Sequence, residues 1–208
     1  MSKEASLTRW IRLCLKLGVE PQPLVFASLL KKYTQPNRYY HNIHHIGKCL
    51  LELDKAKAIA RNEEITELCI WFHDVAYDPR RDDNEEQSAK YAAQTLNRMS
   101  LHEHIDVVKT MIESTKHSGE VKDQDTRVLL DVDLTILGQS QEEYHSYSKA
   151  IRKEYNHLSG EEYIKRRNET LRRFLNRENI YHTELFRAKY EKKARENMRR
   201  EISNLENI

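Results

Sequence analysis

The sequence predicts an all-α protein organised as a single domain over residues 1–208. Only 5 glycines and 4 prolines occur in the 208 residues, and helix breakers this sparse favour long helices over a turn-rich β fold. Apolar residues recur at intervals of three and four along most of the chain, which is the period of an amphipathic helix. No segment alternates with period two for long enough to indicate a strand. A chain of this length buries a core without disulfides or a structural metal.

Four helices are expected in the first 75 residues. The first two are separated by a break from Gly18 to Pro23, and their apolar stripes are Trp10, Leu13 and Leu17, then Val25, Leu29 and Leu30. After an interruption at Pro36, a third helix is expected over 38–58. A fourth, over 63–75, contains the almost uninterrupted apolar run ITELCIWF, which is typical of a central helix that is buried on all sides.

Six further helices are expected in the rest of the chain. The segment YDPRRDDNE stops the fourth helix and supplies polar start signals for the next one. The expected ranges are 85–99, 105–114, 126–137, 141–157, 160–177 and 183–204. Gly138 stands in a C-cap position after the third of these. We expect a metal-binding core over about 38–140, with the helices of 141–208 packed on it.

Charge and cysteine content limit the classes of protein to consider. The chain has 35 Lys and Arg against 33 Asp and Glu, a formal net charge of +2, which gives no global attraction to nucleic acid or an anionic membrane. Cys14, Cys49 and Cys69 lack a C-x-x-C spacing and read as reduced thiols. The charged N-terminus lacks the apolar region of a secretory signal, and PQPLVFASLL is far shorter than the roughly 20 residues of a membrane helix. We therefore expect a soluble, cytoplasmic protein.

Three short segments place metal-ligating side chains on otherwise ordinary helices. In YHNIHH, His41 and His45 are four residues apart and share one face of the expected helix. His44 lies on the neighbouring face, so the three histidines cannot converge on one ion. His73 and Asp74 follow an apolar run, where a buried carboxylate needs a charged partner or a metal. The third segment, LLDVDL, again places two carboxylates inside an apolar helix.

Each segment by itself also has an ordinary structural explanation. A histidine pair decorates many helices, and Asp131 and Asp133 fit a cap and a salt-bridge partner. Together and in this order, the segments favour a shared metal, because three separate buried clusters of acid and imidazole would be an expensive core. One imidazole of the first segment, the His-Asp pair and one late aspartate make a donor set of two nitrogens and two oxygens. That set suits Mn²⁺, Mg²⁺, Co²⁺, Ni²⁺ or Fe²⁺, and Zn²⁺ also fits.

The order H…HD…D resembles the pattern that names the HD superfamily of metal-dependent phosphohydrolases. YHNIHH also resembles the Tyr-His-Asn-x-x-His segment of cyclic-nucleotide phosphodiesterases, a branch with the same helical core. The chain is more closely similar to a bacterial family described as predicted metal-dependent HD phosphohydrolases. The matching segments span about residues 38–200 and are YHNIHHI, WFHDVAYDP, DNEEQSA, ESTKH, DVDLTILG, YHSYSKAIRKEY and KYEKKARENM.

The resemblance implies the metal ligands. They are His45, His73, Asp74 and Asp133, the last chosen over Asp131 because it directly precedes Leu134. Asp131 would then lie beside the ligands. Dinuclear HD enzymes have further histidines after the His-Asp pair, in a more closely spaced set than this chain offers, which indicates one tight metal site rather than a permanent pair.

The resemblance also implies catalytic and substrate-binding residues. His41 matches the position that protonates the leaving oxygen, and imidazole changes charge near neutral pH, as that role requires. Asn42 would orient this histidine or a carboxylate near the metal. Glu85 either contacts metal-bound water or a second ion, or complements the dipole of its helix. Lys116 and His117 are candidate phosphate contacts, and His117 is also a candidate ligand of a second metal.

Aromatic residues form a stripe on the helix expected over 141–157. Tyr144, Tyr147, Ile151 and Tyr155 recur at helical spacing, with Arg152 beside Tyr155. Such a stripe is ordinarily core. An arginine among aromatic rings also suits a phosphate while the rings stack on a base, so Arg152 and Tyr155 are candidate substrate contacts.

The expected function is metal-dependent hydrolysis of a nucleotide or another small phosphate ester. The metal would activate a water molecule, Asp74 or Asp133 would steer it, and His41 would donate a proton to the leaving group. One alternative is a catalytically idle HD domain that senses a nucleotide or a metal. Another is a nucleic-acid-binding helical protein, based on the basic segment RAKYEKKARENMRR, although such a run is usually a solvated face. A homo-oligomer is left open.

Overall fold

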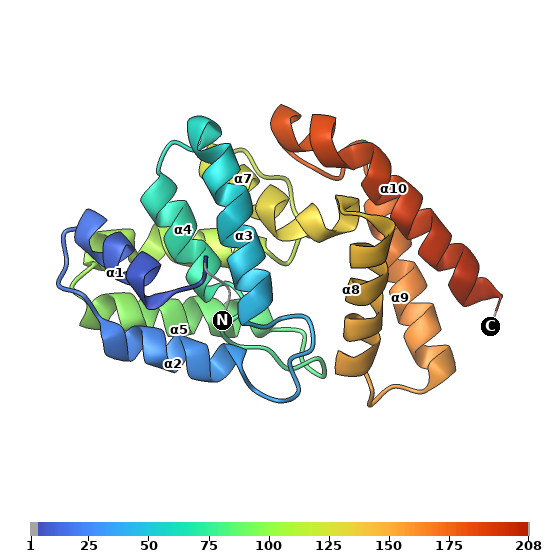
Figure 1. Cartoon of the computed structure of the whole chain (residues 1–208), viewed down its shortest axis with the longest axis horizontal. Helices are drawn as coiled ribbons and strands as arrows, with labels where there is room; N and C mark the ends of the chain where they lie inside the picture. Colours follow the sequence, from blue (N-terminus) through green and yellow to red (C-terminus); the bar gives the residue numbers. More distant parts are fainter. Residues whose placement is uncertain (1–3, 208) are drawn as a thin grey trace. The chain divides into compact units, whose positions relative to one another are not determined.

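The computed structural model describes residues 4–207, and all regular secondary structure in this part of the chain is helical (Figure 1). It forms ten α-helices and three short 3-10 helices, with no strand between residues 4 and 207, which confirms the predicted fold class. No helix in this range is both long and apolar enough to cross a bilayer. The chain divides into two compact units, the first ending at Val132 and the second beginning at Asp133. The single domain expected over 1–208 stays a prediction.

Seven α-helices build the first unit. They are α1 (Leu7–Lys16), α2 (Pro23–Tyr33), α3 (Ile43–Ala56), α4 (Glu63–Phe72), α5 (Asn84–Arg98), α6 (Ile105–Ser114) and α7 (Gln124–Asp133), with 3-10 turns η1 (Lys57–Ile59) and η2 (His102–His104). Only the last residue of α7 belongs to the second unit.

Helix α4 is the centre of the first unit. Every residue from Ile65 to Phe72 is buried, and the helix packs against α1, α3, α5 and α6. The Trp71 ring meets Trp10 of α1 edge to face at 5.8 Å between centroids, a favourable arrangement for aromatic pairs. The Tyr33 hydroxyl of α2 donates to the carbonyl of Trp71 at 3.0 Å. The central position predicted from the apolar run is thereby confirmed.

Helix α3 begins later than the sequence suggested. Asn42 is its N-cap, with extended backbone and a side-chain oxygen that accepts from the His44 amide at 2.9 Å. A helix begins at such a cap. The side-chain oxygen accepts the hydrogen bond of an amide that, in a longer helix, would have bonded to a carbonyl of the preceding turn. The expected start at residue 38 is therefore wrong, and His41 lies before the helix. His41 and His45 consequently do not share a helical face.

Helix α7 ends earlier than predicted. It stops at Asp133, and the chain tightens into the 3-10 turn η3 (Leu134–Gly138). The helix predicted to continue to residue 137 is thus a helix followed by a tighter turn, and Gly138 ends that turn rather than capping the α-helix. The ranges of the other helices agree with the prediction to within a few residues at each end.

The second unit contains η3 followed by α8 (Gln141–Glu154), α9 (Gly160–Leu175) and α10 (Glu184–Glu206). Ser159 caps α9 in a reciprocal arrangement with Glu162, which satisfies two amides that the helix start leaves unpaired. A buried ion pair joins α9 to α10, with Arg167 donating to both carboxylate oxygens of Glu201 at 2.9 and 3.0 Å. The Tyr144 hydroxyl of α8 donates to the same carboxylate at 2.5 Å.

Gly138 allows η3 and α10 to approach each other closely. A Cβ at this position would lie 2.6 Å from the Tyr190 Cβ and 2.8 Å from the Tyr190 carbonyl oxygen. Both distances are too short for non-bonded atoms, and a backbone atom cannot turn away as a flexible side chain does. Contact between η3 and α10 therefore depends on the absence of a side chain here.

We predict that Gly138→Ala lowers the free energy of unfolding of the second unit by about 1–3 kcal/mol, the usual cost of overpacking. Urea unfolding followed by circular dichroism measures the change. Gly160→Ala is the matched control, since a Cβ at Gly160 meets nothing within 4 Å. Equal stability of the Gly138 variant and the unsubstituted protein would contradict the close packing.

Candidate metal centre

Three side chains predicted as ligands converge within the first unit. His45 lies in the first turn of α3, and His73 and Asp74 lie in the turn directly after α4. The Nε2 atoms of His45 and His73 are 3.2 Å apart, and Asp74 Oδ2 lies 3.3 Å from the first and 3.1 Å from the second. The structure thus brings together two imidazole nitrogens and one carboxylate oxygen as a group able to hold a metal ion.

The spacing of these three atoms fits one divalent ion. Metal–nitrogen and metal–oxygen bonds of about 2.1 Å separate neighbouring ligand atoms by about 3.0 Å at right angles and about 3.4 Å in a tetrahedron. The observed separations of 3.1, 3.2 and 3.3 Å fall between these values. The three atoms are therefore spaced as neighbouring ligands of one divalent ion would be.

A hydrogen bond to the main chain sets the tautomer of His73. Its Nδ1 lies 3.0 Å from the carbonyl oxygen of Ile70. A carbonyl oxygen only accepts, so Nδ1 carries the proton, and Nε2 of the neutral ring presents its lone pair toward His45 and Asp74. Metal-ligating histidines commonly donate their second nitrogen in this way.

Asp74 supplies a buried carboxylate oxygen with unused capacity. Oδ2 is shielded from solvent and accepts no hydrogen bond of good geometry, although both imidazole nitrogens lie within 3.3 Å. Burial by itself would raise the pKa of this carboxyl, but interactions with the neighbouring His73, His41 and His45 side chains outweigh it and hold the pKa well below its usual range. Asp74 is therefore a carboxylate near neutral pH, as a metal ligand must be.

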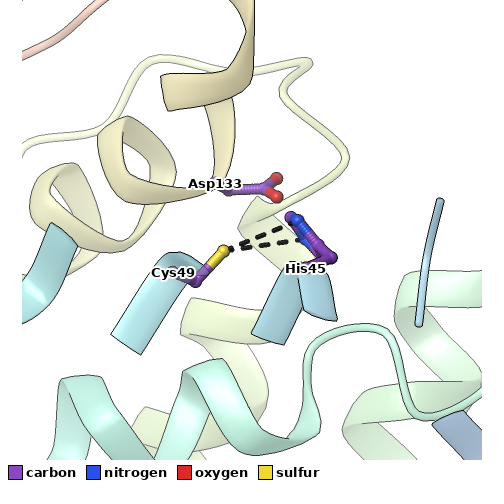
Figure 2. A group of neighbouring side chains, drawn as sticks. All are labelled: His45, Cys49 and Asp133. Carbon is purple, nitrogen blue, oxygen red and sulfur yellow. Dashed lines mark hydrogen bonds between the residues drawn. The ribbon is translucent and has the colours of Figure 1, made fainter. Parts of the chain in front are cut away.

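Cys49 is a neighbour of the centre that the sequence analysis did not single out. Its Sγ lies 3.7 Å from both ring nitrogens of His45, one turn earlier on α3 (Figure 2). The thiol is only 2% exposed and contacts the imidazole ring. The sequence contains one signal of this contact, the spacing of four residues between His45 and Cys49 on one helix. The absence of a C-x-x-C spacing indicates only that the cysteines are reduced thiols.

Arg38 holds the two ligand-bearing segments together. One guanidinium nitrogen donates to the carbonyls of His41 at 3.0 Å and Asp74 at 2.6 Å, and the other donates to Val75 at 3.0 Å. The side chain is 6% exposed, and its guanidinium lies over the Tyr77 ring at 5.7 Å. Arginine suits this position because its planar group offers several donors in fixed directions. No periodicity or motif marks it, since its partners are main-chain atoms.

His41 lies beside the centre on the irregular segment before α3. Its ring stacks on Tyr77 at 4.1 Å between centroids and meets the His45 ring at 6.1 Å. The shared helical face predicted for these two histidines is wrong, but the stacking on Tyr77 and the Asn42 turn still leave the His41 ring next to that of His45. His44 is exposed and points away from the buried ring of its neighbour His45, in agreement with a structural role.

No protein-family model, curated protein or solved structure matches the chain. The resemblance to HD phosphohydrolases stays a prediction from the motifs. The case for a divalent ion rests on the geometry of His45, His73 and Asp74.

Glu85 lies in the first turn of α5 and is half-buried. Burial raises the pKa of its carboxyl, and the charge of Asp74 acts in the same direction. The adjacent Glu86, by contrast, is exposed and pairs with Lys116 at 2.9 Å. Glu85 is thus less exposed than its neighbour in the same helical turn, and both roles expected for it stay predictions.

Lys116 and His117 lie just after α6. The Lys116 ammonium donates to the carbonyl of Asp82 at 2.8 Å as well as to Glu86, so it ties this turn to the start of α5. His117 adopts a left-handed backbone conformation with φ of 53°, which is uncommon for a residue with a side chain. The phosphate contacts predicted for both residues, and the second-metal role for His117, stay predictions.

The two aspartates of α7 differ in position. Asp131 is fully buried in the first unit, whereas Asp133 is the last residue of the helix and opens the second unit. Figure 2 draws Asp133 at the end of α7. Its choice over Asp131 as the fourth ligand stays a prediction.

The remaining candidate substrate contacts have identifiable partners in the main chain. Both groups of the Asn42 amide bond to backbone, accepting from His44 and donating to Tyr39 at 2.9 Å. In the second unit, the Arg152 guanidinium donates to the carbonyls of Tyr155 and Leu158 and so caps the end of α8. The substrate contacts predicted for Asn42, Arg152 and Tyr155 stay predictions.

We predict that Arg38→Lys lowers the free energy of unfolding of the first unit by about 1–3 kcal/mol, because an ammonium group cannot reach all three carbonyls and a buried carbonyl is left unsatisfied. Chemical denaturation monitored by tryptophan fluorescence is the measurement. Arg12→Lys on the exposed face of α1 is the control, with an expected change within about 0.5 kcal/mol. Equal effects of the two substitutions would mean that Arg38 does not hold the segments together.

Proposed function

We propose that this chain is a metal-dependent phosphohydrolase that acts on a nucleotide or another small phosphate ester. The observation that carries the proposal is the convergence of His45 Nε2, His73 Nε2 and Asp74 Oδ2 at 3.1–3.3 Å, with Oδ2 buried and accepting no hydrogen bond. Without an ion, two imidazoles and a carboxylate so placed would be a costly arrangement in a protein interior. The order of the motifs along the chain supports the choice of phosphate esters.

The residues present fit a divalent ion. His45, His73 and Asp74 would hold it, and Asp133 is the fourth ligand that the motif predicts. Nitrogen and carboxylate donors suit Mn²⁺, Fe²⁺, Co²⁺, Ni²⁺, Mg²⁺ or Zn²⁺. One tight site is proposed, because only one such group of three lies wholly within the first unit as far as residues 4–132 describe it.

A bound divalent ion would polarise a phosphoryl oxygen and lower the pKa of a coordinated water toward about 7. The protein side chains would orient the water and donate the proton to the leaving group. Asp74 would accept a hydrogen bond from the attacking water through its carboxylate and so orient it. Glu85, half-buried within the electrostatic reach of Asp74, would hold water at the same side of the centre.

His41 would deliver the proton that the leaving oxygen needs. Its ring stacks on Tyr77 and its carbonyl accepts a hydrogen bond from Arg38, and these two contacts would restrict its movement beside the centre. Proton transfer from a positioned imidazole typically contributes about 10²–10⁴-fold to the rate.

The first test is metal binding and metal-dependent hydrolysis. Protein stripped with a chelator should bind Mn²⁺ in calorimetric titrations, and Mn²⁺ or Co²⁺ should restore hydrolysis in a screen of phosphomonoesters and phosphodiesters. His73→Ala should weaken Mn²⁺ binding by more than the about 10–100-fold that loss of an outer partner costs. His44→Ala removes an exposed imidazole one position from a ligand and should leave affinity and activity unchanged.

Full activity in the His73 variant would contradict the assignment of the metal centre. The protein could also bind Mn²⁺ tightly, hydrolyse no ester and release an intact nucleotide when loaded with metal. This result would contradict the proposed reaction but not the metal centre. That outcome would support a sensor that binds without turnover.

The second test separates proton donation by His41 from a structural role. His41→Gln should lower kcat by about 10²–10⁴-fold on esters with an alkoxide leaving group. The loss should be much smaller on p-nitrophenyl phosphate, whose leaving group departs without a proton. Mn²⁺ affinity should not change. Equal losses on the two substrates would show that His41 only supports the structure of the centre.

A further inference from the structure

The second unit contains a cavity that the proposed reaction does not use. It has a volume of about 790 Å³ and is lined by one face of α8, the start of α9 and the last turns of α10. Small-molecule pockets commonly measure about 300–1,000 Å³. All the lining residues belong to the second unit, so the cavity is a property of that unit by itself.

The inner wall of this cavity is apolar and aromatic. Tyr144 and Tyr163 are buried, 4% and 5% exposed, and Ile164 and Leu205 add aliphatic surface. Aromatic and aliphatic walls of this kind stabilise an apolar ligand body by removing its surface from water.

The buried carboxylate in the wall is already neutralised. Glu201 lines the cavity, but it accepts both bonds from Arg167 and a third from the Tyr144 hydroxyl. A fully paired carboxylate has little attraction left for a cation. The wall therefore gives no reason to expect a positively charged ligand.

The rim of the cavity carries cations that are not paired with acids. Lys149 of α8 and Arg200 of α10 are exposed and line the cavity. Arg200 donates only to the amide oxygen of Asn197, at 3.3 Å, and neither residue forms an ion pair within residues 4–207. Glu142 is the one other acid in the lining. With Glu201 neutralised, the rim has an excess of positive charge.

We propose that this cavity binds an amphipathic organic anion, a small molecule with an aromatic or aliphatic body and one anionic group. The body would lie against Tyr144, Tyr163 and Ile164, and the anionic group would interact with Lys149 and Arg200. Neither the metal centre nor its reaction is needed for this binding, so the second unit adds a ligand site of its own to the chain.

Anilinonaphthalene sulfonate is a suitable probe, because it combines an aromatic body with one anionic group and fluoresces more strongly in an apolar surrounding. The chelator-treated full chain should bind it saturably with a fluorescence increase. Octanoate should displace the probe at least about tenfold better than octanol, which has the same body without the charge. Equal displacement by the two would overturn the anionic part of the proposal.

Charge reversal locates the site. Lys149→Glu combined with Arg200→Glu should weaken probe binding by about tenfold or more, since both cations would be lost and two acids added. Lys165→Glu on α9 is the matched control, because Lys165 is exposed and does not line the cavity. The affinity of the Lys165→Glu variant for the probe should equal that of the unsubstituted protein. Both substitutions are at exposed positions, and circular dichroism verifies that the helices persist.

Two results would overturn the proposal. One is unchanged probe binding in the double charge-reversal variant. The other is binding without saturation, which indicates adsorption to exposed apolar surface. A third variant tests the volume of the cavity separately from the charge of its rim. Ile164→Trp should reduce probe affinity, because the larger side chain fills the cavity while both cations remain. Unaltered affinity in this variant would mean that the probe binds elsewhere.

Discussion

Helix α4 is buried on every side from Ile65 to Phe72, and this requires neighbours around its whole circumference. Burial of its eight residues from Ile65 to Phe72 removes a large apolar surface from water, which is the dominant favourable contribution to folding. The helices α1, α3, α5 and α6 supply that cover. Because α4 ends in the interior, the next two residues, His73 and Asp74, are fixed there as well. The location of the candidate metal centre is thus a consequence of packing.

In the turn directly after α4, most polar groups have a defined partner. His73 Nδ1 is satisfied by Ile70, and the carbonyls of Asp74 and Val75 are satisfied by Arg38. What stays unsatisfied is Asp74 Oδ2, which faces two imidazole nitrogens. Unsatisfied buried polar atoms are rare and costly in folded proteins. The position of this one, among ligand-type atoms at ligand-type spacing, is why a divalent ion explains the site better than a structural network does.

The second unit also contains buried charged groups. Here the buried Arg167 donates to both carboxylate oxygens of Glu201, and the Tyr144 hydroxyl donates to the same carboxylate, so that Glu201 has little attraction left for a cation. The unpaired charges of this unit are instead exposed, on Lys149 and Arg200. The two units therefore differ in the chemistry that they present, one with lone pairs directed inward and the other with cations around an apolar cavity.

The sequence by itself determined the fold class, the order of the helices, the central place of α4 and the burial of a His-Asp pair at its end, because these follow from local periodicity and from the cost of burying polar groups. The tertiary structure decided that Asn42 starts α3, which removes His41 from the helix, and that Tyr77 returns it to the centre by stacking. It also decided that Arg38 joins two segments about 36 residues apart, a contact to main-chain atoms that no side-chain pattern records. The cavity of the second unit was likewise decided only by packing, because proximity between residues distant in sequence depends on how helices meet and not on the spacing within each one. The contact of Cys49 with His45, by contrast, follows from their spacing of four residues on α3.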